Sequence, residues 1–282
     1  MTTPAEVAAA GQLACLLEVS APKPGNVSPE RHFHDTRYED FLASAVAIGP
    51  ALANAGTLPL GVTVRSAVDA TLRWTRSNTN LGIVLLLAPL ARAALGSGGT
   101  LRERLSGVLA ATTVGDAAEV YAAIRHAHPG GLGESAAEDV SVAPTVTLRD
   151  AMALAAGRDA IAREYVTDFA LTFETGVPAL RAARREGLAW TDAAVDAFLA
   201  LLDAAADTHI ARKLGPAEAA RVSGRARAIR AAGGTRSPEG RAMLTALDAE
   251  LRDPRNRRNP GTTADLTCAA LFVVIIEGEW DP

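Results

Sequence analysis

The chain has 282 residues, of which 49% are hydrophobic and only 4% are aromatic, and its formal net charge at pH 7 is −4. A chain of this length can bury a substantial core. The acidic balance argues against non-specific binding to nucleic acid, which depends on a basic surface. We therefore expect no nucleic-acid partner.

The composition predicts an all-α protein, because alanine and leucine are strong helix formers and windows of alternating strand pattern are scarce. Thr3-Pro-Ala-Glu6 has the pattern of a capping box and opens a helix that should end near Val19. Further helices are expected over 38–52, 62–74, 81–95, 151–185, 191–206, 216–232, 238–253 and 262–276, with capping boxes at Thr100, Thr113 and Thr147. No repeat or linker interrupts the chain, so residues 1–282 are predicted to form one domain of about ten helices.

No segment has the features of a membrane span or an export signal. The longest apolar run, 266–276, is far shorter than the roughly 20 residues that a spanning helix needs. The N-terminus lacks the basic segment and apolar core of a secretory signal. Cys15 and Cys268 lie in apolar helical patterns and are interpreted as small buried hydrophobes. We expect a cytoplasmic protein that makes no membrane contact.

The segment 18–35, EVSAPKPGNVSPERHFHD, is the most distinctive polar stretch. Its three prolines restrict the backbone, and Pro-Gly is a turn dipeptide. A stiff polar loop between apolar helices favours a binding site, although an ordinary solvated connection is the alternative. The candidate binding residues in it are Lys23, Pro24, Gly25, Asn26, His32 and His34.

Four more polar segments lie at predicted helix boundaries. Ser77–Asn80 precede an apolar helix, where small polar residues either cap free amides or help to bind an anion. The glycines of HAHPGGLG would allow a close backbone approach to a ligand, but they match no phosphate-loop pattern. Segments 207–213 and 253–265 combine carboxylates with cations. The candidate binding residues are Asn78, Thr79, Asn80, Gly82, Gly130, Gly131, Arg212, Arg258, Asn259 and Gly261.

These helix-boundary segments would bring opposite charges into one crevice. Cations there could neutralise a polyphosphate through charge-assisted hydrogen bonds, and carboxylates could hold Mg²⁺ together with substrate phosphates. The motifs of zinc and serine hydrolases are absent from the sequence. The cations are Lys23, Arg212, Lys213, Arg255, Arg257 and Arg258, and the carboxylates are Glu18, Asp35, Asp207 and Asp265.

The chain resembles the triphosphoribosyl-dephospho-CoA synthase family from Glu18 to about Ile276. The resemblance rests on APKPGNV with HFHDT, SNTNLGIVLLLAPLARA, DTHIARKLG and NPGTTADLTCAALF, in that order. It implies an all-helical transferase that moves the triphosphoribosyl group of ATP to an alcohol of dephospho-CoA and releases adenine. The expected partners are ATP with Mg²⁺ and a small cofactor-precursor alcohol, and a homodimer remains an open option.

Departures from the family pattern place the chain in a divergent branch. Many members carry Asn-Thr-His-Lys-Gly where this chain has Asn-Thr-Asn-Leu-Gly at 78–82, so an expected cation is missing. The motif Lys-Pro-Gly-Leu-Val-Asp becomes Lys-Pro-Gly-Asn-Val-Ser at 23–28 and loses a carboxylate, and Asp-Thr-Asn becomes Asp-Thr-His at 207–209. Phosphoribosyl transfer onto another cofactor precursor, such as a pterin alcohol, is therefore an alternative. A non-catalytic nucleotide- or CoA-binding protein, a helical scaffold and a nucleoside-phosphate hydrolase are others.

Displacement of adenine from C1′ would pass through an oxocarbenium-like transition state, as glycoside hydrolysis does. It requires that the phosphates are held and neutralised. On this hypothesis Asp207 and Asp265 bind Mg²⁺ and phosphate, and Lys23 and Arg258 supply positive charge.

The same reaction needs a base for the acceptor hydroxyl and an acid for the departing adenine. Glu18 or Asp35 is assigned as the base or as the anion that faces C1′. His209 is the candidate acid, because an unperturbed histidine pKa of ~6.5 suits proton transfer at neutral pH. Asp265 is expected to be catalytic as well as metal-binding, so that Asp265→Asn leaves a folded, nearly inert protein.

Overall fold

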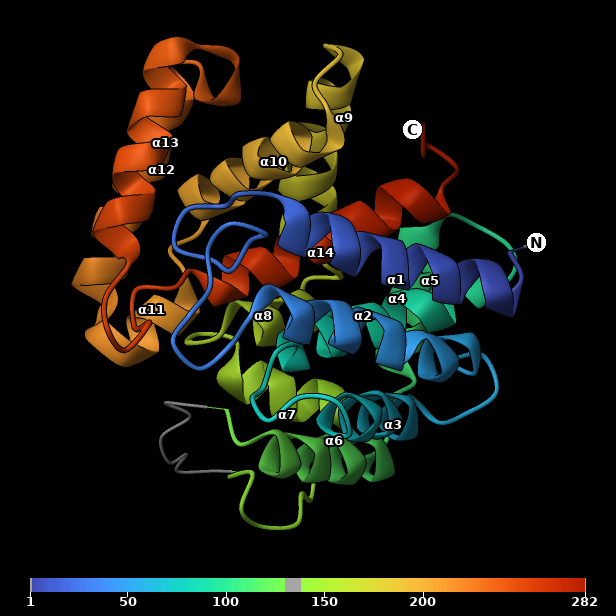
Figure 1. Cartoon of the computed structure of the whole chain (residues 1–282). Coiled ribbons are helices and arrows are strands. Elements are labelled where there is room, and N and C mark those ends of the chain that lie inside the picture. Colours follow the sequence, from blue (N-terminus) through green and yellow to red (C-terminus); the bar gives the residue numbers. More distant parts are fainter. Residues whose placement is uncertain (1, 130–137, 282) are drawn as a thin grey trace.

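The computed structural model describes residues 2–129 and 138–281, and the elements of regular structure in this part of the chain are helices joined by loops (Figure 1). The α-helices are α1 (Pro4–Ser20), α2 (Tyr38–Ala53), α3 (Leu60–Leu72), α4 (Leu81–Leu95), α5 (Leu101–Ala110), α6 (Val114–Ala127), α7 (Leu148–Ala155), α8 (Ala160–Val166), α9 (Val177–Arg185), α10 (Trp190–Ala204), α11 (Thr208–Leu214), α12 (Pro216–Ala231), α13 (Pro238–Leu251) and α14 (Gly261–Ile276). A π-helical turn precedes α9 and a 3₁₀ turn precedes α13. The all-α prediction is confirmed, but the predicted number of about ten helices is too low.

Local capping starts several helices where the sequence predicts them. The Thr3 hydroxyl accepts a hydrogen bond from the Glu6 amide at 3.2 Å, and the Glu6 carboxylate accepts one from the Thr3 amide at 2.7 Å. The same reciprocal arrangement opens α5 at Thr100 and α6 at Thr113. Capping boxes satisfy amides that the first helical turn leaves free, so they fix where these helices begin.

The segment 151–185 is broken into several helices, whereas the sequence predicts one long helix whose expected point of interruption is 176–178. Asp159 caps α8 by accepting from the amides of Ile161 at 2.9 Å and Ala162 at 3.2 Å. Asp168 and Phe169 have φ values of 51° and 58°, which a right-handed helix cannot contain. The break before α8 matters for the site, because it turns Asp159 toward the interior.

The centre of the molecule is formed by α4 and α14. The apolar residues of α4 are buried on nearly all sides, and α14 packs against α1, α4, α9 and α10. In Figure 1, α14 crosses the middle of the molecule with α1 alongside it. Both cysteines are free and buried here, with their sulfur atoms 3.7 Å apart. The beginnings of α4 and α14 meet inside the protein, where Gly82 lies against the side chain of Asp265.

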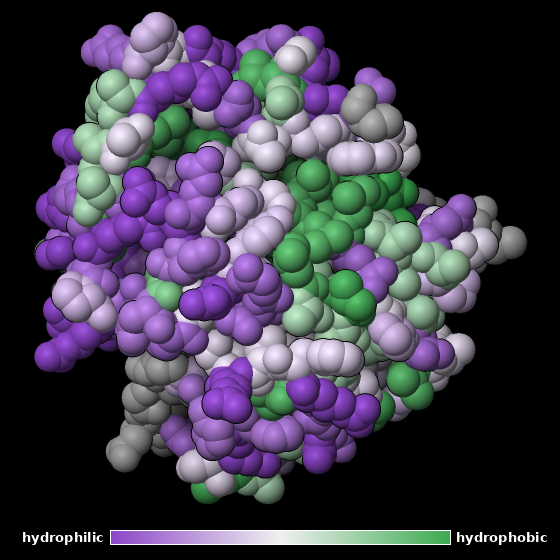
Figure 2. All heavy atoms as spheres, viewed as in Figure 1, coloured by the Kyte–Doolittle hydropathy of each residue, from purple (hydrophilic) through white to green (hydrophobic). Residues whose placement is uncertain are grey.

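The surface is uneven in character. Figure 2 shows apolar side chains gathered on the face that α1 crosses, whereas the side that carries α12 and α13 is mostly hydrophilic. Within the described ranges, none of the helices is long and apolar enough to cross a membrane. The open option of a homodimer stays a prediction.

Candidate active site

A cavity of about 670 Å³ opens where the starts of α4, α8, α11 and α14 converge. The loop after α1 closes one side of it, and α6 and α7 close another. Its wall contains Glu18 and Asn26 from the beginning of the chain together with Asn259 and Asp265 from the end. The two ends of the chain therefore share one crevice, as the sequence analysis expected.

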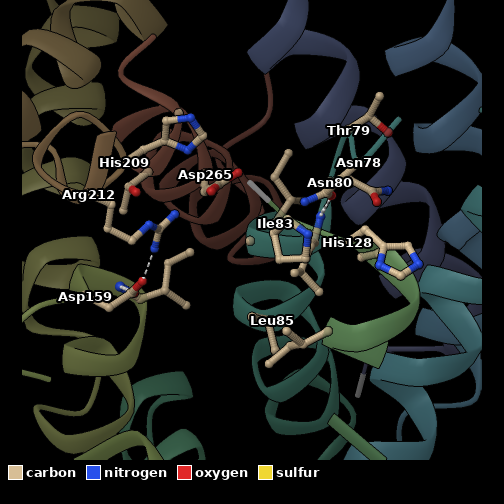
Figure 3. Close-up of a pocket in the computed structure, with 18 of the residues that line it drawn as sticks. Asn78, Thr79, Asn80, Ile83, Leu85, His128, Asp159, His209, Arg212 and Asp265 are labelled. Carbon is tan, nitrogen blue, oxygen red and sulfur yellow. Dashed lines mark hydrogen bonds and ion pairs between the residues drawn. The ribbon is translucent and has the colours of Figure 1, made fainter. Parts of the chain in front are cut away.

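Asp265 lies at the centre of this crevice. Figure 3 shows its carboxylate between His209, Arg212 and Asp159 on one side and the residues that start α4 on the other. Burial raises the pKa of Asp265 well above its usual value, and the carboxylates of Glu18, Asp207 and Asp159 raise it further. A cation that binds beside Asp265 would therefore stabilise the ionised form of its carboxyl group.

The segment before α4 has structural bonds of its own and also faces the cavity. The side-chain oxygen of Asn78 accepts from the Leu81 amide at 3.0 Å, so Asn78 caps the helix. The Asn80 amide group donates to the Thr71 hydroxyl at 3.0 Å, and the Thr79 hydroxyl is bonded to Ser44. Asn78, Thr79 and Asn80 therefore make hydrogen bonds within the protein and also line the cavity.

His209 faces the cavity from α11 in a setting that disfavours its charged form. Burial lowers its pKa from 6.5 to about 3, and the nearby positive charges of Lys213 and Arg212 contribute. At neutral pH the imidazole is therefore neutral. The lowered pKa works against the predicted role of His209 as a general acid, because the imidazolium form is scarce at pH 7, and the role itself stays a prediction.

Four cations line the cavity and form no ion pair with any carboxylate in the described ranges: Arg76, Arg158, Lys213 and Arg255. Arg212 also lines it, but its guanidinium is paired with Asp159 at 2.5 Å. Burial lowers the pKa of Lys213, and the charge of Arg212 acts in the same direction. Unpaired positive charge on a concave surface favours an anionic ligand.

Polar atoms without partners are concentrated at the same place. Buried side-chain polar atoms normally have a hydrogen-bond partner, so an exception needs an explanation. Nε2 of His209, Nε of Arg212 and Oδ1 of Asn259 are buried and have no partner among the described residues. All three residues belong to the cavity wall, so a polar ligand is a natural source of the missing bonds.

Comparison with known proteins connects this cavity to a family. The family model CitG, described as ATP:dephospho-CoA triphosphoribosyl transferase, matches residues 4–282. The chain belongs to the CitG family. A probable 2-(5″-triphosphoribosyl)-3′-dephosphocoenzyme-A synthase of Stutzerimonas stutzeri (strain A1501) is 38% identical over 105 residues, which are 37% of this chain and 36% of that protein.

Two further relatives agree with this membership. A protein of the same name from Pseudomonas aeruginosa (strain UCBPP-PA14) is 35% identical over 108 residues, or 37% of this chain and 36% of that protein. The chain thus spans about a third of the length of these two curated relatives in the matched region. A crystal structure from Archaeoglobus fulgidus, described as a triphosphoribosyl-dephospho-CoA synthase, superposes with a TM-score of 0.66 at 27% identity and covers 84% of this chain and 99% of its own.

Most residues that the sequence predicts for the CitG-family site lie on the cavity wall, but seven do not. On the wall are Glu18, Asn26, Asp35, Asn78, Thr79, Asn80, Gly82, His209, Arg212, Asn259, Gly261 and Asp265. Off the wall are Lys23, Pro24, Gly25, His32, His34, Asp207 and Arg258. Gly130 and Gly131 lie outside the described residues.

Lys23 is a structural residue and not a free phosphate-binding cation. It is 1% exposed, and its ammonium group pairs with the Glu18 carboxylate at 2.9 Å and also donates to the carbonyl oxygen of Ala21 at 3.2 Å. Arg258 is likewise engaged, because its Nε donates to Glu218 at 2.9 Å. The positive charge on the cavity wall comes instead from Arg76, Arg158, Lys213 and Arg255.

Asp207 does not reach the cavity as the predicted metal ligand. It is 2% exposed, and its carboxylate caps α11 at the Ile210 amide, 3.0 Å away. The other oxygen accepts from the amide and the hydroxyl of Thr263, each at 2.8 Å. With both oxygens occupied, Asp207 joins the starts of α11 and α14 and so positions the helix that carries Asp265.

The Pro-Gly turn and the two histidines of the first polar loop also have structural or peripheral positions. The Gly25 amide donates to Asp248 at 2.8 Å, and its φ of 74° is one that glycine adopts without strain. His32 accepts from the Tyr38 amide at 3.2 Å, and His34 lies at the surface beside Asp35. Asp35 itself is 58% exposed, so it belongs to the mouth of the cavity rather than to its centre.

The wall residues that were not singled out as site residues from the sequence include Arg76, Arg158 and Asp159. Arg76 adjoins the Ser77–Asn80 segment, which was the only signal for it. Arg158 and Asp159 lie in the turn between α7 and α8, and the prediction of one helix across this turn concealed them. Recognising Asp159 as a helix cap would have revealed both.

Proposed function

We propose that the chain transfers the triphosphoribosyl group of ATP to an alcohol of dephospho-CoA and releases adenine. The observation that carries this proposal is a cavity in which Asp265 lies among other carboxylates, while the same wall carries four cations that have no ion pair among the described residues. Such a site suits a ligand that is anionic at one end and develops positive charge at a sugar carbon. The description of the CitG family names this reaction.

The unpaired cations are the proposed site for the triphosphate. Arg76, Arg158 and Arg255 are exposed, whereas Lys213 is partly buried. Guanidinium groups bind phosphate oxygens through paired hydrogen bonds, so these arginines suit a polyphosphate chain. In this arrangement the phosphates lie toward the solvent, and the ribose lies deeper, toward Asp265.

Asp265 is the proposed base. As the bond between C1′ and N9 of adenine breaks, a bond forms between C1′ and the acceptor oxygen, and the proton of that hydroxyl passes to the carboxylate. The departing adenine takes up one proton, so that neutral adenine leaves and the proton held by the carboxyl balances the step when it is passed on. Positive charge that develops at C1′ favours the ionised form of the carboxyl, which burial and neighbouring carboxylates otherwise disfavour. Neutral His209 and Asn259 offer hydrogen bonds to the sugar or to the base, since each has an unpartnered polar atom.

Mg²⁺ enters this proposal with ATP. Among the residues that the structure describes, no group of three or more His, Cys, Asp or Glu side chains is arranged to hold a metal ion alone. Magnesium in nucleotide sites is commonly held by one or two carboxylates and the substrate phosphates, and Asp265 fits that limited requirement. When bound, the ion would neutralise phosphate charge. We propose the cytoplasm, where ATP is abundant, as the place of this reaction.

Mass spectrometry of the acceptor tests the proposal. The protein is incubated with ATP, Mg²⁺ and dephospho-CoA, and the expected product has the combined mass of the two substrates less that of adenine. An unchanged acceptor beside intact ATP would contradict the proposal. Free adenine with an unchanged acceptor would identify a nucleoside-phosphate hydrolase instead, and a pterin alcohol run in parallel tests the other acceptor.

A further inference from the structure

The wall of the cavity that α6 and α7 form is mainly apolar, whereas the region around Asp265 is polar and charged. The residues that α7 contributes to it include Leu148, Ala151, Met152 and Ala155, which are all apolar. α6 adds Val120 and Ile124. Met152 and Ile124 are only partly buried, so apolar surface faces the open space of the cavity.

Two polar groups of the described residues near this wall are already engaged. The Tyr121 hydroxyl donates to the Glu138 carbonyl oxygen at 2.7 Å, and the His126 ring is bonded to Asp69 at 2.7 Å. Among the described residues, the α6 and α7 side chains of this wall other than Tyr121 and His126 are apolar and offer a phosphate or a purine edge no donor or acceptor; the cation Arg158 lies beyond the end of α7. An aliphatic segment needs none and gains from leaving water.

α4 joins the apolar wall to the reacting centre. Gly82, in its first turn, adjoins Asp265, and Leu85 lines the cavity one turn later. Figure 3 shows Leu85 farther from Asp265 than Ile83 in this view. A ligand whose hydroxyl lies at Asp265 could therefore extend an aliphatic chain along α4 toward α6 and α7.

We propose that this apolar wall, formed by Leu85, Val120, Ile124, Leu148, Ala151 and Met152, binds the pantetheine arm of dephospho-CoA. The inference rests on the proposed function, which supplies the acceptor. Of the two substrates, only dephospho-CoA carries a long arm whose methylene and gem-dimethyl groups, separated by amides, can pack on apolar side chains, whereas ATP consists of a base, a sugar and phosphates. The phenyl rings of Phe33 and Phe41, which line the cavity from the loop after α1 and from α2, are better suited to stack on a purine.

Ala151→Trp tests the assignment by filling the space in front of α7. The matched control is Ala153→Trp, because Ala153 lies on the same helix but is exposed and outside the cavity wall. The KM for dephospho-CoA should rise by roughly tenfold or more in Ala151→Trp, since several methylene groups lose their buried site. The KM for ATP should stay near the native value, and Ala153→Trp should resemble the native protein in both KM values.

Met152→Gln, which keeps the side-chain length, should raise the KM for dephospho-CoA with little change in melting temperature.

Free pantetheine provides a measurement that does not depend on turnover. It should bind the native protein and Ala153→Trp in calorimetry and should bind Ala151→Trp much more weakly. In kinetics it should compete with dephospho-CoA and not with ATP.

The assignment is overturned if pantetheine competes with ATP, or if Ala151→Trp raises the KM for ATP alone. Equal pantetheine binding by Ala151→Trp and the native protein overturns it as well. If the native protein releases no adenine, the proposed function is refuted. The calorimetry would still show separately whether the apolar wall binds pantetheine.

Discussion

Gly82 and Asp265 are in direct contact across the starts of α4 and α14. A Cβ atom at position 82 would lie 2.6 Å from Cγ of Asp265 and 2.8 Å from Cδ1 of Ile161, which are distances that real Cβ atoms do not tolerate. Glycine is therefore required for the approach of α4 to the carboxylate, although its backbone there is ordinary helix. This contact sets the position of the proposed base.

Gly82→Ala should displace the Asp265 carboxylate and lower kcat by about 10²-fold, because misplacement of a reacting group by about 1 Å has effects of that size. Overpacking should cost about 1–3 kcal/mol of stability. Steady-state kinetics and urea denaturation measure both. Gly224→Ala in α12 is the control, since nothing lies within 4 Å of its new methyl group. Full activity in Gly82→Ala would separate Asp265 from the chemistry.

Asp265→Asn should reduce turnover by about 10²–10⁴-fold, the usual contribution of general acid–base assistance. The variant should fold, because the amide has nearly the shape of the carboxyl group and removes a buried ionisable group. Near-native turnover with unchanged KM values would remove Asp265 from the mechanism. A collapsed circular dichroism spectrum would instead assign it a structural role.

The stability of the native protein should depend on pH through Asp265. Its pKa in the folded state lies well above the 3.8 of an ordinary aspartate, so above pH 3.8 the folded state keeps a proton that the unfolded chain releases. The free energy of unfolding therefore falls as the pH rises from 3.8 through the raised pKa. Asp265→Asn lacks this linkage, so its stability relative to the native protein should increase with pH in urea denaturation. A constant difference across that range would contradict the raised pKa.

His209 should remain neutral at physiological pH. Since burial lowers its pKa from 6.5 to about 3, its imidazole resonances should not shift between about pH 5 and pH 8, where an unperturbed histidine titrates. His209→Gln identifies the resonance in the NMR spectrum by its loss. In the native protein this histidine makes the free energy of unfolding rise with pH from about 3 to 6.5, because the unfolded chain binds the proton there. A titration midpoint near pH 6.5 would restore His209 as a candidate acid.

Loss of an unpaired cation from the cavity should weaken ATP binding. Arg76→Gln and Arg255→Gln should each raise the KM for ATP by roughly tenfold, the effect expected for one charge-assisted hydrogen bond. The effect should shrink as salt concentration rises. Arg185→Gln serves as the control, because Arg185 is exposed and lies outside the cavity wall. Equal KM values in all three variants would place the triphosphate elsewhere.

The sequence was sufficient for the fold class, and most of the site residues that it predicts lie on the cavity wall. Helix starts marked by capping boxes, such as those at Thr3 and Thr100, were predicted correctly because the signal is local and the bonds form within one turn. Asp265 and Asn78 were found because each is a polar residue at or just before the start of a long apolar helix. These features depend on a few consecutive residues only.

Sequence reasoning failed where the outcome depends on distant partners. The sequence suggests that Lys23 is a free cation, but its ammonium group is buried against Glu18. It also suggests that Asp207 is a metal ligand, but one oxygen of its carboxylate accepts a hydrogen bond from Thr263. The break between α7 and α8 was missed because alanine-rich sequence hides a cap within a helical pattern. Burial also reversed the expected charge state of His209, which no local pattern could show.

The central claim is that C1′ of ATP becomes bonded to an oxygen of dephospho-CoA in the cavity around Asp265. ATP labelled with ¹³C at C1′ tests it most directly, because the carbon resonance distinguishes a bond to nitrogen from a bond to oxygen. With Mg²⁺ and dephospho-CoA present, the account predicts that the native protein moves the label from ATP to the acceptor, whereas Asp265→Asn leaves it in ATP. A label that stays in ATP with the native protein, or that appears in free ribose triphosphate, would contradict the account.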